Sequence, residues 1–370
     1  MSPAPSVLHV FIVWHPESTT CGDLARDMFR ALDANPDIPA SRGLGIPVRF
    51  RTSSSADAVP SPVPFGSAVH TVVFVLVDDE LAADTQWRSY AEELAASCGA
   101  GDVVVPVAIT ETANLPPKLA TLQAIRLHGV GADDVSTALL NGAMRDLCQL
   151  LDPDAAKVRV FLSHAKGDGL DLTTEVRRHL HEDAGLDDFF DATDIPDGAT
   201  FADYMKKCAG SLPVLLAVHT DSYSSREWCR LEVLEAKRSH VPIVVLSASV
   251  GREARSFPYM GNVPVVRWKD SSSLPHVVGL LLGEVLRDRF FPLRVAAICA
   301  QMGLDAEADV FPFPPELVTV LTHRAEVIAT GGKVGRYLYP DPPLGTEELM
   351  LLLALDADLD PVTPTMLMAQ

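Results

Sequence analysis

Short apolar runs alternate with helical patterns along most of this chain, from residue 8 to about residue 268. Runs such as Val72–Val77 and Val158–Leu162 have the length and the β-branched composition of buried strands. A regular strand–helix alternation predicts βα units and a parallel sheet covered by helices. The chain has 370 residues, of which 48% are hydrophobic, so it is long enough to form two or three such cores.

The alternation contains an internal repeat. Val72–Val77 is followed ten residues later by Trp87, and Val214–Val218 is followed ten residues later by Trp228, so both features recur at an offset of 141 residues. Upstream of residue 72 the offset changes to 150, which indicates surface loops of different length. The repeat predicts two tandem flavodoxin-like parallel-sheet domains; the alternative is that any two α/β units look alike at this level.

We expect three segments, namely an α/β domain over residues 1–150, a second α/β domain over residues 151–272 and an extension over residues 273–370. The βα rhythm stops after about residue 272, and the patterns beyond it are helical. Two of the expected helices are Leu274–Arg289 and Pro292–Met302. The extension is therefore expected to be mainly helical. It is too apolar for a disordered tail, so it should pack on the second domain or on another subunit.

Composition excludes several classes of function. The formal net charge of −19 argues against direct binding of nucleic acid or of an anionic membrane. The six cysteines form no Cys-x-x-Cys or Cys/His cluster, so neither a metal site nor a disulfide framework is indicated, and a reducing cytoplasm fits best. The N-terminus lacks a signal-peptide pattern, and no apolar run approaches the roughly 18 residues needed to span a membrane.

Two polar loops of the second domain are expected to meet. Ser163 to Asp168 follow its first strand, and Asp221 to Ser225 follow its third strand. In a flavodoxin-like strand order these two loops flank the topological switch point, where ligands bind. Ser163 and Lys166 are expected to face a phosphate, with Asp168 as a helix-capping acid. The alternative for the first loop is an ordinary capped turn.

The second loop leads into Trp228 and Glu232, which lie four residues apart at the start of a predicted helix. Side chains at this spacing share one helix face. An indole beside a carboxylate suits a ligand that has an aromatic base and a bond whose cleavage leaves positive charge. The alternative is that Trp228 belongs to the core and that Glu232 is a solvated or capping acid.

Three motifs in order give residues 157 to 270 a resemblance to the Toll/interleukin-receptor (TIR) domain family. Val160 to His164 resembles the first box, Phe190 to Gly198 resembles the second-box loop, and Ser225 to Glu232 is similar to the Trp-Cys-x-x-Glu segment of the NAD-cleaving members. The second box has Thr193 where an arginine is common, and Ser225 stands one residue further from the Trp than in many relatives. Residues 8 to 128 resemble the same fold only faintly, as a degenerate TIR-like copy.

The resemblance implies cleavage of the nicotinamide–ribose bond of NAD or NADP, with Glu232 as the catalytic residue. It further implies that a base contacts His164 and Phe201 and that Lys166 contacts the pyrophosphate. The substrate-binding residues implied as a whole are Ser163, His164, Lys166, Phe201, Ser225 and Trp228. NAD enters as a substrate, with no cofactor and no metal. At the offset of 141, Ala91 stands where the second copy has Glu232, so we expect the first copy to have lost the carboxylate.

Two functions of different class follow. The first is an NAD glycohydrolase that acts as a cytoplasmic defence effector, is activated by self-association through its TIR surfaces, and responds to an upstream sensor protein. The second is a non-catalytic adaptor in which both copies are homotypic docking surfaces and Glu232 is structural. A nucleotide-binding sensor without turnover is a third reading. A carboxylate and an indole placed together in the crevice favour the enzyme, because an adaptor has no need of that pair.

Overall fold

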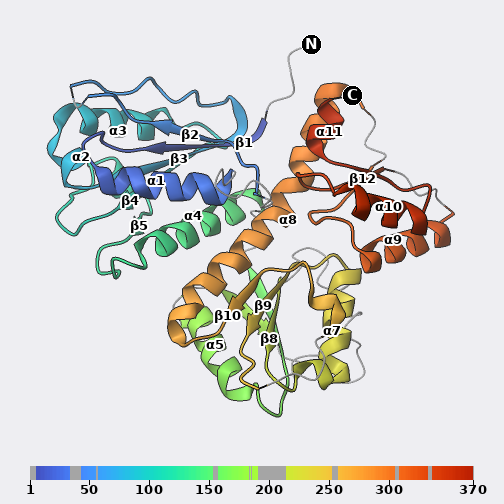
Figure 1. Cartoon of the computed structure of the whole chain (residues 1–370). Coiled ribbons are helices and arrows are strands. Elements are labelled where there is room, and N and C mark those ends of the chain that lie inside the picture. Colours follow the sequence, from blue (N-terminus) through green and yellow to red (C-terminus); the bar gives the residue numbers. More distant parts are fainter. Residues whose placement is uncertain are drawn as a thin grey trace.

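The computed structural model describes residues 6–33, 43–55, 57–152, 157–182, 184, 186–190, 214–251, 257–304, 308–331 and 336–369. Three units lie around one long helix, α8 (Figure 1). The first unit has a parallel sheet of order β2-β1-β3-β4-β5 with helices on both faces. Its elements are β1 Ser6–Val13, α1 Thr19–Leu32, β2 Val48–Arg51, β3 Ala68–Val77, α2 Asp79–Ala83, α3 Thr85–Ser97, β4 Val103–Ala108, η1 Leu119–Thr121, β5 Ile125–Arg126 and α4 Val135–Leu151.

The second unit repeats this topology, with a parallel sheet of order β10-β9-β8-β6-β7. In both units the first strand is second from one edge and pairs with the second and third strands of its unit, which is the flavodoxin-like order expected from the sequence. The elements of the second unit are β6 Arg159–His164, α5 Leu170–Glu182, β7 Asp187–Phe190, β8 Val214–His219, η2 Tyr223–Ser225, α7 Glu227–Arg238, β9 Ile243–Ser247, η3 Pro258–Met260, β10 Val265–Arg267, η4 Ser271–Ser273 and α8 Leu274–Met302.

The third unit contains helices and also a small parallel sheet of order β11-β12-β13. Its elements are β11 Ala308–Val310, α9 Leu317–Ala329, β12 Arg336–Leu338, α10 Thr346–Leu355, β13 Asp360–Val362 and α11 Pro364–Met368. The helices described in this unit agree with the expectation of a helical extension, whereas its short strands were not predicted from the sequence. A stacked pair of rings, Phe311 on Tyr337 with centroids 3.8 Å apart, lies in the core of this unit.

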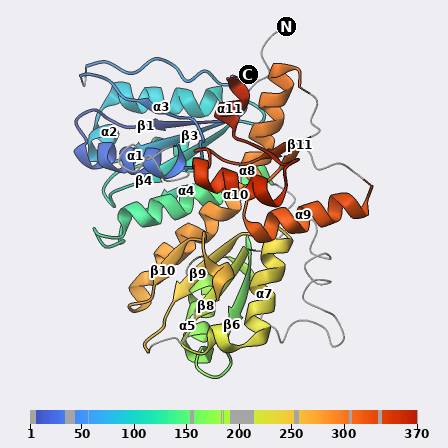
Figure 2. The same cartoon turned by 45° about the vertical axis from the view of Figure 1, so that its right-hand side comes forward.

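Helix α8 connects all three units. The sequence pattern predicts two helices separated at Pro292, but the structure has one continuous helix with Pro292 inside it. Proline removes one backbone hydrogen bond, and here the apolar packing along both halves of the helix outweighs that loss. The helix packs on α4 and β1 of the first unit, on α5, β8 and β9 of the second unit and on α11 of the third (Figures 1 and 2).

One apolar cluster runs from the first unit into the second. Alternate residues of β1 and β3, such as Val10 and Phe74, point to the face covered by α1 and α4, and Val160 and Leu216 point to the corresponding face of the second sheet. Helices α4 and α8, which close their respective sheets, pack against each other between these faces. The opposite face of each sheet is covered by α3 or α7. Within the described ranges, no helix has the length and apolarity required to cross a bilayer.

Candidate functional site

The site lies at the carboxyl ends of β6 and β8, where the sheet order reverses. The loop after β6 and the loop after β8 are tied together by Asp168, whose carboxylate accepts hydrogen bonds from the Thr220 hydroxyl at 2.8 Å and from the Ser222 backbone N–H at 2.9 Å. Burial on its own would raise the pKa of Asp168. The hydrogen bonds from Thr220 and Ser222 together outweigh that effect and hold the pKa below its ordinary value. We expected Asp168 to cap a helix; instead it fixes the spacing between two loops.

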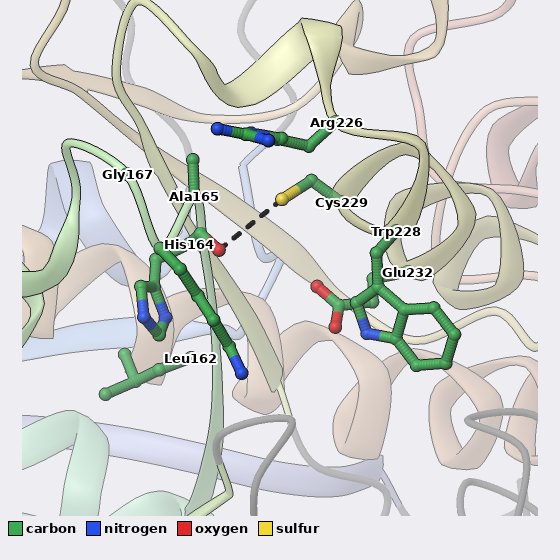
Figure 3. A pocket seen from close by; sticks show the side chains of 9 residues that line it. Leu162, His164, Ala165, Gly167, Arg226, Trp228, Cys229 and Glu232 are labelled. Carbon is green, nitrogen blue, oxygen red and sulfur yellow. Dashed lines mark hydrogen bonds between the residues drawn. The ribbon is translucent and has the colours of Figure 1, made fainter.

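A pocket of about 600 Å³ opens beside these loops. Such a volume falls within the range of small-molecule sites. Figure 3 shows the Glu232 carboxylate beside the Trp228 indole, with the His164 ring on the opposite wall. The lining residues are Leu162, His164, Ala165, Lys166, Gly167, Arg226, Trp228, Cys229 and Glu232. Two stretches that were selected separately from the sequence therefore meet in one crevice.

Glu232 is a buried acid on the inner wall of this pocket. Only 2% of the residue is exposed, although it stands on α7 among apolar neighbours. The Ser163 hydroxyl donates a hydrogen bond to Glu232 Oε2 at 2.5 Å. A hydrogen bond to a carboxylate favours its ionised form and fixes its orientation, and both effects are larger in a buried site.

The next group along is the Tyr223 phenol, whose oxygen lies 2.6 Å from Ser163 Oγ. Ser163 has one proton and donates it to Glu232, so Tyr223 is the donor to Ser163. Burial holds the pKa of Tyr223 well above its ordinary value, and the phenol therefore stays protonated. All three side chains are buried, and together they form one chain of hydrogen bonds from Tyr223 to Glu232.

Two cations are among the residues that line the pocket. Lys166 comes from the loop after β6, and Arg226 is the N-cap residue that immediately precedes α7. The Arg226 guanidinium lies over Gly167, where an added Cβ would stand 3.1 Å from Nη2, so a larger residue at 167 would crowd the guanidinium. Neither Lys166 nor Arg226 forms an ion pair with another residue in the described part of the chain. The pair offers positive charge to an anionic group of a ligand.

The pocket also contains a cysteine that is unsuited to nucleophilic chemistry. The Cys229 thiol donates to the His164 carbonyl at 3.4 Å. Burial, together with the neighbouring Glu232 charge, raises the pKa of Cys229 to about 12. A thiol with so high a pKa is protonated at neutral pH and is a poor nucleophile. Over the described ranges, no cluster of three or more His, Cys, Asp or Glu side chains is placed to hold a metal ion.

The structure brings most of the expected site residues together. His164, Lys166, Trp228 and Glu232 line the pocket. Ser163 does not face a phosphate as expected, because it is 1% exposed and its hydroxyl is committed to Glu232. Of the remaining two expected residues, Ser225 does not line the described pocket, and Phe201 is not among the described residues. Ser225 donates to the Ser222 carbonyl at 2.7 Å, and Phe201, like the second-box loop from Asp191 onward, lies outside the described residues.

Two residues that contribute to the site, Arg226 and Tyr223, were not predicted from the sequence. Arg226 precedes the Trp228 helix, and a basic residue at a helix N-terminus in a ligand crevice is a signal that was available. Tyr223 gave no such signal. Its role follows only from the position of η2 between β8 and α7, which places the phenol next to Ser163.

The strand registers and the buried helix positions determine the residue offset between the two α/β units. The strand registers pair Val10 with Val72 in one sheet and Val160 with Val214 in the other, which sets an offset of 142 residues from β3 to β8. Burial along α3 and α7 follows this same offset, with Trp87, Tyr90, Ala91 and Leu94 buried in one helix and Cys229, Glu232, Val233 and Ala236 in the other.

The offset of 141 taken from the two tryptophans was therefore wrong by one residue. Trp87 corresponds to Cys229, and Glu232 corresponds to Tyr90 rather than to Ala91. Trp87 is wholly buried, whereas Trp228 is 49% exposed at the pocket. A tryptophan near the start of each helix gave a matching spacing although the two side chains lie on different helix faces.

The far end of α7 is held by the third unit. Lys237 is 6% exposed, and its Nζ lies 2.7 Å from both carboxylate oxygens of Glu316, the residue that caps α9. Lys237 also donates to the Gly261 carbonyl at 3.0 Å, and the His240 ring packs on Phe311 with centroids 4.7 Å apart. One helix thus carries the pocket residues in its first half and the contact with the third unit in its second half.

Comparison with known proteins gives a family match for the second unit. The family model described as "TIR domain" matches residues 160–270. No curated protein matches the chain significantly. Among solved structures, the C-terminal domain of glucosamine-fructose-6-phosphate aminotransferase from Francisella tularensis is similar over 81% of this chain and 85% of its own, at 11% sequence identity and a TM-score of 0.20. That TM-score is too low to support any inference about fold or function.

Proposed function

We propose that the pocket of the second unit, whose residues 160–270 match the TIR domain family, cleaves the nicotinamide–ribose bond of NAD. A TIR domain supports a function either as an NAD-cleaving enzyme or as an adaptor. The observation that carries the enzyme proposal is the buried carboxylate of Glu232 on the wall of a pocket of about 600 Å³, next to an exposed indole. An acid that is buried, hydrogen-bonded and open to a ligand pocket is a candidate catalytic group.

The chemistry follows from the leaving group. Nicotinamide departs as a neutral molecule from the cationic form of NAD, so the site need not protonate it. Positive charge then develops on the ribose, and a fixed carboxylate stabilises that charge in proportion to its burial. The Trp228 ring forms an apolar wall beside Glu232, which limits the access of water. In this proposal Glu232 is the catalytic residue and Trp228 and His164 contact the substrate.

The two cations that line the pocket favour a dinucleotide over a simple nucleoside. Lys166 and Arg226 provide a lysine and a guanidinium for a pyrophosphate, which offsets the repulsion expected from a chain of net charge −19. Attack by water on the ribose would give ADP-ribose, and attack by the adenine would give a cyclic product. NADP remains an alternative substrate of the same class.

The biological setting that we propose is cytoplasmic defence, with activation through self-association of TIR surfaces downstream of a sensor protein. Assembly is a reasonable switch because a head-to-tail neighbour can complete an open pocket at the edge of a domain. Specific activity measured across a concentration series, beside light scattering, tests this part. Specific activity that does not rise with assembly would contradict activation through self-association.

A second candidate is an adaptor, and one observation favours it. Trp228 and Leu231 are 49% and 48% exposed on α7, which is unusual for two large apolar side chains so close together. In that case the exposed face of α7 would dock another TIR surface, and Glu232 would serve only to fix the helix on the sheet.

Purified full-length protein incubated with NAD tests both candidates. We expect nicotinamide release by the wild type and a decrease of at least about 100-fold for Glu232→Gln, since removing one fixed charge-stabilising group costs that much in other enzymes. Glu227→Gln is the matched control, because Glu227 is exposed on the same helix and outside the pocket. Equal release by both variants would contradict the role of Glu232, and no release by any protein, even when assembled, would favour the adaptor.

A further inference from the structure

Tyr223 is the most deeply buried ionisable group near the pocket, and it contacts no ligand space. Its side chain is wholly buried in the core beneath α7, with Phe161, Ala217 and Val233 in the same cluster. Its backbone N–H is bonded to the Thr220 carbonyl at 3.0 Å, so the residue is fixed from both the main chain and the ring. Placing a phenol in such a core is costly unless its hydroxyl is bonded.

That hydroxyl is bonded to Ser163, and Ser163 is in turn bonded to Glu232. The distances are 2.6 Å and 2.5 Å, and the proton count assigns both donors toward the carboxylate. Each member stands on a different element: Tyr223 on η2, Ser163 on β6 and Glu232 on α7. Because hydrogen bonds in a chain polarise one another, the bond from Ser163 is stronger when Tyr223 donates to its oxygen.

We infer that Tyr223 is a positioning residue that acts through Ser163 to hold Glu232 ionised and aimed into the pocket. This inference rests on the proposed NAD cleavage for its catalytic consequence. Tyr223 does not touch the substrate, and it is separated from the pocket wall by Ser163. Its contribution is to complete the hydrogen bonding of the serine, so that the serine offers its proton only to the carboxylate.

The first unit provides a natural contrast for this assignment. Its strand register places Val13 where the second unit has Ser163, and the helix offset places Tyr90 where the second unit has Glu232. The Tyr90 hydroxyl donates to the Ser61 carbonyl at 3.2 Å instead of to a serine side chain. We call the hydrogen-bonded chain Tyr223–Ser163–Glu232 the relay. Tyr90 is a buried tyrosine outside this relay, so it serves as a control in the same molecule.

The test is a double-mutant cycle on the full-length chain with Tyr223→Phe, Ser163→Ala and the pair. We expect kcat to fall about tenfold for Tyr223→Phe and about 100-fold for Ser163→Ala, with KM changed little, because the lost bonds serve a charged group. In the Ser163→Ala background, Tyr223→Phe should have less than about a twofold effect. Tyr90→Phe is the control variant, and near-ultraviolet circular dichroism verifies the native packing of every protein.

The pH dependence separates positioning from packing. Loss of a hydrogen bond to the carboxylate favours its protonated form, so the acid limb of the kcat profile should move to higher pH in Tyr223→Phe and further in Ser163→Ala. A purely structural Tyr223 would lower activity equally in both backgrounds and leave the profile unchanged. Either of those results would overturn the inference.

A second readout needs no turnover. The carbon-13 resonance of the Glu232 carboxyl group, assigned by its loss in Glu232→Gln, can be titrated in each variant. Titration at higher pH in Tyr223→Phe, combined with no nicotinamide release by the wild type, would mean that the relay exists and that NAD cleavage is wrong. An unchanged titration together with active wild type would mean that the enzyme is right and the relay is wrong.

Discussion

The two α/β units of this chain have the same strand order, but they differ in the side chains of the helix that follows the third strand. Both sheets have the order 2-1-3-4-5, and both have buried helix positions at an offset of 142 residues. Yet the first unit fills the crevice with Trp87 and Tyr90, and the second leaves it open between Trp228 and Glu232. A fold that offers a binding crevice therefore does not guarantee one, because the side chains at very few positions decide whether it stays hollow.

The difference depends on polar partners as much as on size. Ser163 gives the Glu232 carboxylate a donor, and at the corresponding place in the first sheet Val13 has none. A buried carboxylate without a donor is strongly unfavourable. The acid and its serine therefore have to be present together, and the first unit has neither.

We expect the largest effect from Tyr90→Glu, which puts the acid of the second unit at the corresponding position of the first unit. The change removes a 6% exposed ring and puts a carboxylate opposite Val13, so the free energy of unfolding should fall by about 3–5 kcal/mol. Introduced together with Glu232→Gln, it should restore no nicotinamide release. Urea denaturation and the NAD assay measure the two results. Restored activity would show that the first unit retains a competent pocket.

The two tandem parallel sheets could be predicted from the sequence, but the residue-by-residue correspondence between the two units could not. Strand runs and their spacing were sufficient to predict two tandem parallel sheets, because buried β-branched segments and periodic helices are strong signals. Helix phase is not set by the position of one large residue, and the shared spacing to Trp87 and Trp228 led to the wrong counterpart for Glu232. Strands of three residues, such as Ala308–Val310, are too short to produce a periodic pattern, so the sheet of the third unit was missed.

A smaller effect is expected where the second unit meets the third. Lys237 corresponds to Ala95 at the offset of 142, and only the lysine has a neighbouring unit to pair with. Glu316→Gln should lower the free energy of unfolding by about 2–4 kcal/mol, because a buried ammonium loses its counter-ion while part of the carboxylate was solvated. Thermal denaturation measures the change, with Glu326→Gln on the exposed side of α9 as the control. Equal midpoints for the two variants would contradict the importance of the pair.

The smallest effect concerns a feature that the two units have in common. Asp146 on α4 and Asp288 on α8 are related by the offset of 142, and burial raises the pKa of each to about 6. A carboxyl group whose pKa is higher in the folded than in the unfolded chain favours folding below about pH 4, and that contribution is lost as the pH rises through about 6.

Asp288→Asn should therefore match the wild type in stability near pH 4 and exceed it by about 1–2 kcal/mol at pH 7.5, since the amide carries no charge to bury. Asp146→Asn should behave alike if the helices are equivalent. Urea midpoints at the two pH values test this, with Asp133→Asn at an exposed site as the control. A difference that is independent of pH would show that ionisation of Asp288 is not its source.

The continuous helix α8 also determines how this chain can be divided. Residues 160–270 match the TIR family, but helix α8, which covers β8 and β9 on one face of their sheet, lies wholly beyond residue 270 and is shared with both neighbours. A fragment that ends at the family boundary would expose this apolar part of the sheet face to solvent and be prone to aggregate. The same sharing bears on inheritance: a recombination event at the carboxyl edge of the TIR match separates the domain from α8, and one at the amino edge separates α8 from α4, so the three units are suited to descend as one piece.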